Sequence, residues 1–271
     1  MHPVFFEWDT PTFLSSFLPD KITIYGYGFM IALGTLLAYW HTAYYSKKQY
    51  NVKASQTADL VIILIIAAFV GGKALFFLED PIRYLQSPNE IFAGFENGFV
   101  FFGSLLFCIP AMLWFFKKHN LPVTGMLDIM ALTTCIVHFF GRLGCFFAGC
   151  CYGLPTDSAL AVTFTDPRSH ARPLNEALHP SQLYSVFFLG MIILFLGIYR
   201  AKKKFDGQIF LLYLMIYSFG RMFLEEFRGD YKRGFLFNGL ITHSQLISLL
   251  VIISAFLVYI WLYKKSLRKN N

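Results

Sequence analysis

The chain has 271 residues, of which 56% are hydrophobic and only 14% are charged. A soluble domain carries roughly 25% charged residues, so this composition excludes an ordinary soluble protein. The apolar content and the length also exclude a disordered chain and a small disulfide-bonded scaffold, and an integral membrane protein remains. The net charge of +7 is not a sign of a nucleic-acid partner, because in a membrane protein the position of the charges matters more than their sum. No nucleic-acid partner is expected.

Seven segments are long and apolar enough to form membrane-spanning helices, which need about 20 mostly apolar residues. In chain order they cover 24–46, 58–78, 99–116, 126–147, 180–199, 207–227 and 241–263. None of them alternates between apolar and polar residues as the strands of a membrane β-barrel do. The sequence therefore predicts an all-α polytopic membrane protein with seven transmembrane helices.

The distribution of basic residues predicts the orientation. More than half of the 23 lysines and arginines follow the first, third, fifth and seventh segments, at 47–53, 117–118, 200–204 and 264–269. Because cytoplasmic loops carry the excess of lysine and arginine, we expect the N-terminus outside and the C-terminus in the cytoplasm. We expect a single integral membrane domain over 1–271, in which the segment 148–179 forms a small periplasmic head.

A few ionisable residues lie inside the predicted helices, where a charge is costly and is usually functional or paired. Arg142 lies near the outer end of the fourth segment. Arg221 and Glu225 lie near the outer end of the sixth, four residues apart, so they share a helix face and can pair. Arg228 follows one turn later. A structural ion pair is one interpretation, but arginines that converge at phosphate depth favour an anionic headgroup, since guanidinium binds phosphate bidentately.

Two histidines and a tyrosine are predicted at the same outer level. His138 lies one turn inward from Arg142, and His179 opens the fifth segment. A histidine here is either a proton acceptor or part of a structural hydrogen-bond network. Tyr25 lies at the outer end of the first segment, where interfacial tyrosines are common, so both a structural role and a role in a site stay open.

Three motifs resemble those of the bacterial prolipoprotein diacylglyceryl transferases. Residues 141–153 read GRLGCFFAGCCYG and resemble the family signature GR-(I/L)-GNF-(I/L)-NGE-x-x-G. Residues 179–184 read HPSQLY and match the family run HPSQLYE up to its last residue, while 221–228 are similar to RFFVEFFR. The resemblance extends from about residue 22 to residue 250, and the motifs occur in the same order.

The resemblance implies a multi-pass enzyme of the bacterial cytoplasmic (inner) membrane with its active site toward the outer leaflet. The family transfers the diacylglyceryl group of phosphatidylglycerol to the thiol of the lipobox cysteine of a preprolipoprotein, the first step of lipoprotein maturation. The implied partners are phosphatidylglycerol, preprolipoprotein signal peptides and membrane lipids. No cofactor and no metal is expected.

The resemblance also implies the roles of particular residues. Arg142 and Arg221 are expected to hold the lipid phosphate, with Glu225 orienting Arg221. The expected catalytic set is Arg142, Arg221, Glu225, Tyr25, His138 and His179. The expected substrate-binding set is Arg142, Arg221, Arg228, Gln182, Tyr184 and Gly103.

The chain departs from the family pattern at chemically sensitive positions. Phe102 stands where the family has a histidine that is often proposed to activate the thiol, and phenylalanine cannot accept a proton. His138 is the nearest substitute base by position, and His179 is the alternative. In the signature, Cys145 and Ala148 replace two asparagines and Cys150 replaces a glutamate.

The cysteines Cys145, Cys150 and Cys151 gather at the outer face, and three interpretations stay open. They could form a disulfide such as Cys145 with Cys150, supply a reactive thiol, or bind a metal with a nearby histidine. The Cys-x4-Cys-Cys spacing is not a standard zinc pattern.

Two alternatives to the family activity also stay open. One is a protein of the same fold that transfers a lipid glyceryl group to a different acceptor, which Phe102 and the cysteine cluster would permit. The other is a non-enzymatic phospholipid-binding or transport protein, in which the arginines recognise phosphate and no chemistry follows.

Overall fold

The computed structural model describes residues 3–10, 20–79, 81, 100–229, 235–236 and 241–270. The chain divides into two compact units. The first combines Met1–Trp40 with Leu127–Asn271, and the second is His41–Met126. The described residues are mostly helical, which confirms the helical class predicted from the sequence.

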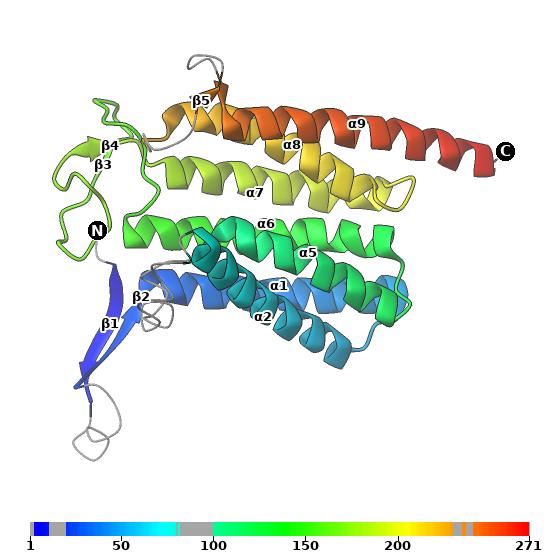
Figure 1. Ribbon diagram of the computed structural model, residues 1–271, viewed down its shortest axis with the longest axis horizontal. Helices are drawn as coiled ribbons and strands as arrows, with labels where there is room; N and C mark the ends of the chain where they lie inside the picture. Colours follow the sequence, from blue (N-terminus) through cyan, green and yellow to red (C-terminus); the bar gives the residue numbers. More distant parts are fainter. Residues whose placement is uncertain are drawn as a thin grey trace. The chain divides into compact units, whose positions relative to one another are not determined.

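Each of the seven apolar segments overlaps an α-helix (Figure 1). The helices are α1 (Gly26–Tyr50), α2 (Ala54–Glu79), α5 (Phe101–Lys118), α6 (Val123–Ala148), α7 (Ser181–Tyr199), α8 (Gln208–Leu224) and α9 (His243–Asn270). Short 3-10 turns, η1 (Arg200–Lys202) and η2 (Glu225–Phe227), extend α7 and α8. Within the described part of the chain, four helical segments are long and apolar enough to cross a membrane: Ala54–Glu79, Val123–Ala148, Ser181–Lys202 and His243–Arg268.

Besides the helices, the described residues include three small antiparallel sheets of two strands each, which the all-α expectation did not include. They pair β1 (Val4–Asp9) with β2 (Lys21–Tyr25), β3 (Val162–Thr163) with β4 (Ala177–Leu178), and β5 (Phe235–Leu236) with β6 (Ile241–Thr242). The β1–β2 strands are rich in β-branched and aromatic residues, which favour extended backbone. Strands of two residues are too short to leave a periodic signal in the sequence.

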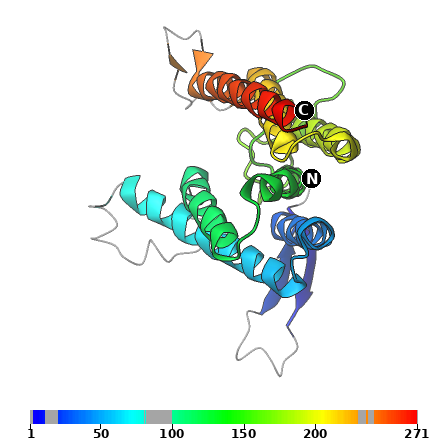
Figure 2. The ribbon, with the colours of Figure 1, turned by 90° about the vertical axis from the view of Figure 1, so that its right-hand side faces the viewer.

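The core of the first unit lies among α6, α7 and α8, which run side by side in Figure 1. Its buried residues are Ala131, Leu132, Cys135, Ile192, Leu196, Ile209 and Tyr213. Helix α9 packs along α8, as Figures 1 and 2 show. Large apolar side chains on the outer face of α7, such as Phe187 and Leu194, are exposed, which is the pattern of a surface solvated by lipid.

The buried carboxylate of Asp128 joins α6 to the start of α8. It accepts hydrogen bonds from the backbone N–H groups of Gly207 and Phe210, both at 2.9 Å, and pairs with Lys203 Nζ at 3.3 Å. The first N–H groups of a helix have no partner within the helix, so Asp128 satisfies donors that would otherwise be unpaired.

In the second unit, α2 and α5 lie side by side (Figure 2), and small residues form their contact. A Cβ on Gly71 would meet the carbonyl oxygen of Gly103, and a Cβ on Gly103 would meet that of Gly71. Next to this contact, Ser104 Oγ donates to the carbonyl oxygen of Ala68 at 2.7 Å. Such close backbone approach is typical of helices that associate in a membrane.

Candidate active site

A pocket in the first unit is lined by arginines from two motifs. Arg142 comes from α6, Arg221 from the last turn of α8, and Arg228 from the residue after η2. The other lining residues are His138, Ser181, Ser185, Phe188, Leu189, Tyr217 and Leu224. The pocket holds about 370 Å³ of empty space, including its open mouth. The expected convergence of the arginines is therefore present.

The loop after α6 holds the start of α7 and the end of α8 together. Gly153 forms an antiparallel bridge with Arg228, and its N–H donates to the carbonyl oxygen of His179 at 2.8 Å. A Cβ at position 153 would collide with the backbone of Phe227 and with His179, so only glycine fits. This joint positions Arg228 beside the pocket.

The arginines are held by partners on their own helices. Arg221 forms an ion pair with Glu225, a residue only 4% exposed, through the i,i+4 spacing seen in the sequence. Arg142 Nε donates a hydrogen bond to His138 Nε2 at 3.2 Å. A carboxylate and an imidazole thus fix the directions of two guanidinium groups.

The HPSQLY run forms the start of α7 and anchors the neighbouring loop. His179 Nδ1 lies 3.0 Å from the hydroxyl of Tyr184. Gln182 is fully buried and donates from Nε2 to the carbonyl oxygen of Cys150 at 2.7 Å. Its Oε1 has no hydrogen-bond partner among the described residues.

Six of the ten expected site residues do not line this pocket: Tyr25, Gly103, His179, Gln182, Tyr184 and Glu225. Tyr25 ends β2 with 52% of its surface exposed, and Gly103 belongs to the α2–α5 contact of the second unit. Conversely, Ser181 and Tyr217 line the pocket but were not expected as site residues. Ser181 lies inside the HPSQLY run, and Tyr217 precedes Arg221 by four residues on the same helix face. Both residues could therefore have been identified from the sequence pattern.

Comparison with known proteins agrees with the motifs. The sequence profile of the family described as prolipoprotein diacylglyceryl transferase matches residues 15–261. The phosphatidylglycerol–prolipoprotein diacylglyceryl transferase of Clostridium tetani is 39% identical over 239 residues, which cover 88% of this chain and 93% of the relative.

Two further relatives carry corresponding names. The phosphatidylglycerol–prolipoprotein diacylglyceryl transferase 2 of Clostridium perfringens is 34% identical and covers 88% of this chain and 91% of its own length. The enzyme of Rickettsia bellii is 31% identical, with 89% and 92% covered. The chain therefore belongs to the prolipoprotein diacylglyceryl transferase family.

Proposed function

We propose that this protein transfers the diacylglyceryl group of phosphatidylglycerol to the lipobox cysteine thiol of preprolipoproteins, the first step of bacterial lipoprotein maturation. Membership of the family supports this activity. The single structural observation that carries it is the pocket in which Arg142, Arg221 and Arg228 converge. This arrangement suits a phosphodiester, because guanidinium groups bind phosphate oxygens in pairs.

All seven long helices cross the bacterial inner membrane in this proposal, as one integral domain over 1–271 with the N-terminus outside. The basic residues after every second helix support this orientation. The active site then opens toward the outer leaflet, and 148–179 forms the periplasmic head. The buried contact of Phe164, Ala171 and Leu178 with Phe146 of α6 supports a head that packs on the helix end.

Charge explains how the pocket accelerates the transfer. The thiolate sulfur attacks the glycerol carbon that bears the phosphate ester, the C–S bond forms, and the C–O bond breaks with its electron pair on the leaving oxygen. The phosphodiester carries one negative charge, whereas the leaving glycerol phosphate carries up to two. Arg142 and Arg221 therefore bind the transition state more strongly than the lipid, which is the condition for catalysis.

The remaining residues orient these arginines, add positive charge to the pocket, or hold the start of α7 in place. Glu225 orients Arg221, and Arg228 adds a third positive charge at the pocket wall. The hydrogen bond from Arg142 uses the acceptor lone pair of His138 Nε2, which supports an orienting role for His138. Gln182 and Tyr184 fix the start of α7, where His179 also lies.

A transfer assay tests the proposed function. The full-length protein in detergent micelles is incubated with phosphatidylglycerol of defined acyl chains and a lipobox peptide, and the peptide mass is followed. We expect an increase equal to one diacylglyceryl group, and none for a control peptide with serine in place of the cysteine. Release of glycerol phosphate without peptide modification would indicate a different acceptor, and lipid binding without release would indicate a non-enzymatic protein.

A further inference from the structure

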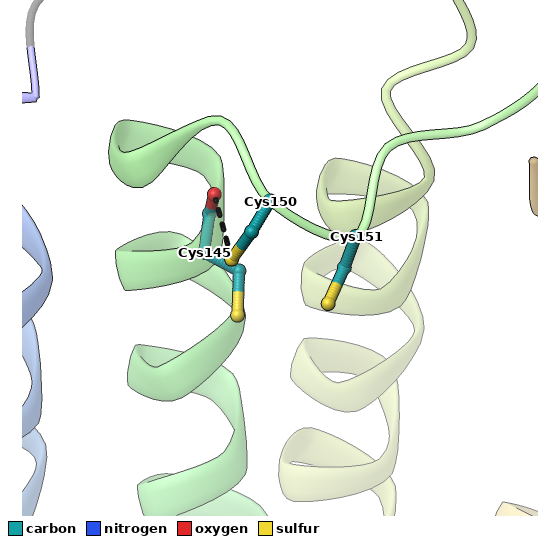
Figure 3. Close-up of side chains that lie close together, drawn as sticks. All are labelled: Cys145, Cys150 and Cys151. Carbon is teal, nitrogen blue, oxygen red and sulfur yellow. Dashed lines mark hydrogen bonds between the residues drawn. The ribbon is translucent and has the colours of Figure 1, made fainter. Parts of the chain in front are cut away.

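Three cysteines converge at the outer end of α6, beside the arginine pocket. The Sγ atoms of Cys145, Cys150 and Cys151 all lie within 4.8 Å of one another (Figure 3). No disulfide joins cysteines in the described part of the chain. Cys145 lies one turn beyond Arg142 on the same face of α6, so the sulfur cluster adjoins the phosphate-binding residues.

The way α6 ends explains this convergence. Gly149 adopts a left-handed conformation with φ of +72°, and the N–H of Cys150 donates back to the carbonyl oxygen of Cys145 at 3.1 Å. The N–H of Gly149 donates to the carbonyl oxygen of Phe146 at 3.3 Å. These two bonds are the Schellman motif, which brings the second residue after a helix onto the residue five positions earlier. Here both of those residues are cysteines.

The cluster is held by the start of α7. Ser181 Oγ donates to the carbonyl oxygen of Cys151, and Gln182 Nε2 donates to that of Cys150, both at 2.7 Å. Both donors are buried, so the two backbone groups cannot reorient freely. The backbone of Cys151 is also in the left-handed region, with φ of +60°. The three sulfurs are therefore preorganised, as a ligand site requires.

Three converging sulfurs suit one metal ion better than a disulfide. A disulfide requires two sulfurs to approach to about 2.05 Å and leaves the third unused. Zinc bonds of about 2.3 Å place tetrahedral sulfur ligands about 3.8 Å apart, so the cluster needs to contract by at most about 1 Å. We propose that Cys145, Cys150 and Cys151 bind one Zn²⁺ ion as thiolates and leave its fourth position open.

Charge balance around the cluster supports this proposal. Arg142 lies one turn before Cys145 on α6, and Arg228 is bridged to Gly153, two residues after Cys151, so both guanidinium groups lie beside the cluster. Binding releases three thiol protons to the solvent and gives a zinc–trithiolate group with one negative charge. The two arginines beside it offset that charge. This explains how a spacing that is not a standard zinc pattern can still bind the ion.

The open position accounts for the missing base at Phe102. A thiol that coordinates zinc loses its proton. On the proposed function, on which this step rests, the lipobox thiol binds zinc and releases its proton to the solvent. Its sulfur then forms the C–S bond while the C–O bond to glycerol phosphate breaks. Zinc keeps its charge throughout, so no oxidant or reductant is needed.

Zinc binding by the reduced, full-length protein in micelles tests the site without using activity. We expect one Zn²⁺ per chain, and a loss of affinity of more than about 100-fold in each of Cys145→Ser, Cys150→Ser and Cys151→Ser. Cys108→Ser on α5 is the matched control and should bind as the unchanged protein does. If the three cluster variants bind Zn²⁺ as tightly as the unchanged protein does, the proposed site is wrong. A Cys145–Cys150 disulfide in protein isolated without reductant would also contradict it.

The open position has its own test with Co²⁺ as a coloured probe. We expect the absorption of the cobalt–thiolate group to change when the lipobox peptide is added, and not with the serine peptide. A spectrum that ignores the cysteine peptide contradicts the open position. If the spectrum responds but no diacylglyceryl group is transferred, the site stands and the proposed function fails. If chelator-treated, metal-free protein transfers at the full rate, the zinc step fails and the proposed function stands.

Discussion

Arg142 and His138 form a pair in which the direction of the hydrogen bond decides the role of the histidine. The guanidinium donates to Nε2, so this nitrogen is an acceptor that is already occupied. A general base needs a free acceptor within reach of the proton that it removes. The pair therefore favours a histidine that orients Arg142 toward the pocket.

Substitutions at His138 separate orientation from base catalysis. A glutamine carbonyl can accept the same hydrogen bond but cannot take a proton at neutral pH. We expect His138→Gln to keep transfer within about tenfold of the unchanged protein with the same pH profile, and His138→Ala to lose about 10- to 100-fold. The measurement is the initial rate of peptide modification between pH 6 and 9. A glutamine variant as inactive as the alanine variant would make His138 the base.

Arg221 and Glu225 form the second pair, and here burial decides the outcome. Glu225 is almost fully buried, so its removal leaves the Arg221 charge without its ion-pair partner. Breaking a buried pair costs about 3–5 kcal/mol, because one charge remains uncompensated.

Thermal unfolding in micelles measures this cost. Glu225→Ala should lower the melting temperature clearly, whereas the double variant Arg221→Ala/Glu225→Ala should lose less than the sum of the two single losses. If the loss of melting temperature in the double variant equals the sum of the two single losses, Arg221 and Glu225 are not coupled.

At the scale of elements, the ends of the helices carry the functional arrangement. Asp128 ties α6 to the start of α8 by accepting two backbone hydrogen bonds, and Gly153 bridges α7 and α8 at the other end. Both contacts join segments far apart in the sequence. Neither contact is readable from helix periodicity.

Asp128→Ala tests the contact between α6 and the start of α8. Loss of the carboxylate leaves buried N–H donors of α8 unpaired, at about 1–3 kcal/mol for each buried group. Asp206→Ala is the matched control, because Asp206 is the exposed second partner of Lys203 and such pairs contribute about 0–1 kcal/mol. We expect a lower melting temperature for Asp128→Ala alone; similar melting of the two variants would contradict the role of the joint.

Gly153→Ala tests the contact that joins the start of α7 to the end of α8. The added methyl group collides with the backbone of Phe227 and with His179, so the bridge to Arg228 must shift. Because small displacements of a charge-stabilising group are costly, the transfer rate should fall at least about tenfold. Gly197→Ala on α7 is the control, because its Cβ meets open space. A Gly153→Ala protein with the full rate would show that the joint does not position Arg228.

At the scale of the whole molecule, long apolar runs and charged residues within them were readable from the sequence. The seven helices followed from run length, and the convergence of Arg142 and Arg221 followed from their positions near helix ends. The two-residue strands were missed because pairing between distant segments leaves no periodic signal. The gathering of Cys145, Cys150 and Cys151 was predicted, but their arrangement stayed open among three interpretations because it depends on the left-handed backbone of Gly149, a conformation that a motif spacing does not display.

The proposal that the arginine pocket transfers the lipid group is tested most directly by the rate of diacylglyceryl transfer from phosphatidylglycerol to a lipobox peptide in two pocket variants. Arg142→Ala and Arg221→Ala should each lower this rate about 100- to 1,000-fold, because each removes a group that stabilises developing phosphate charge. Arg200→Ala, at the opposite end of α7 from the HPSQLY run, should stay within twofold of the unchanged protein, a margin of about 0.4 kcal/mol. Transfer at the full rate by both pocket variants would contradict the proposed active site.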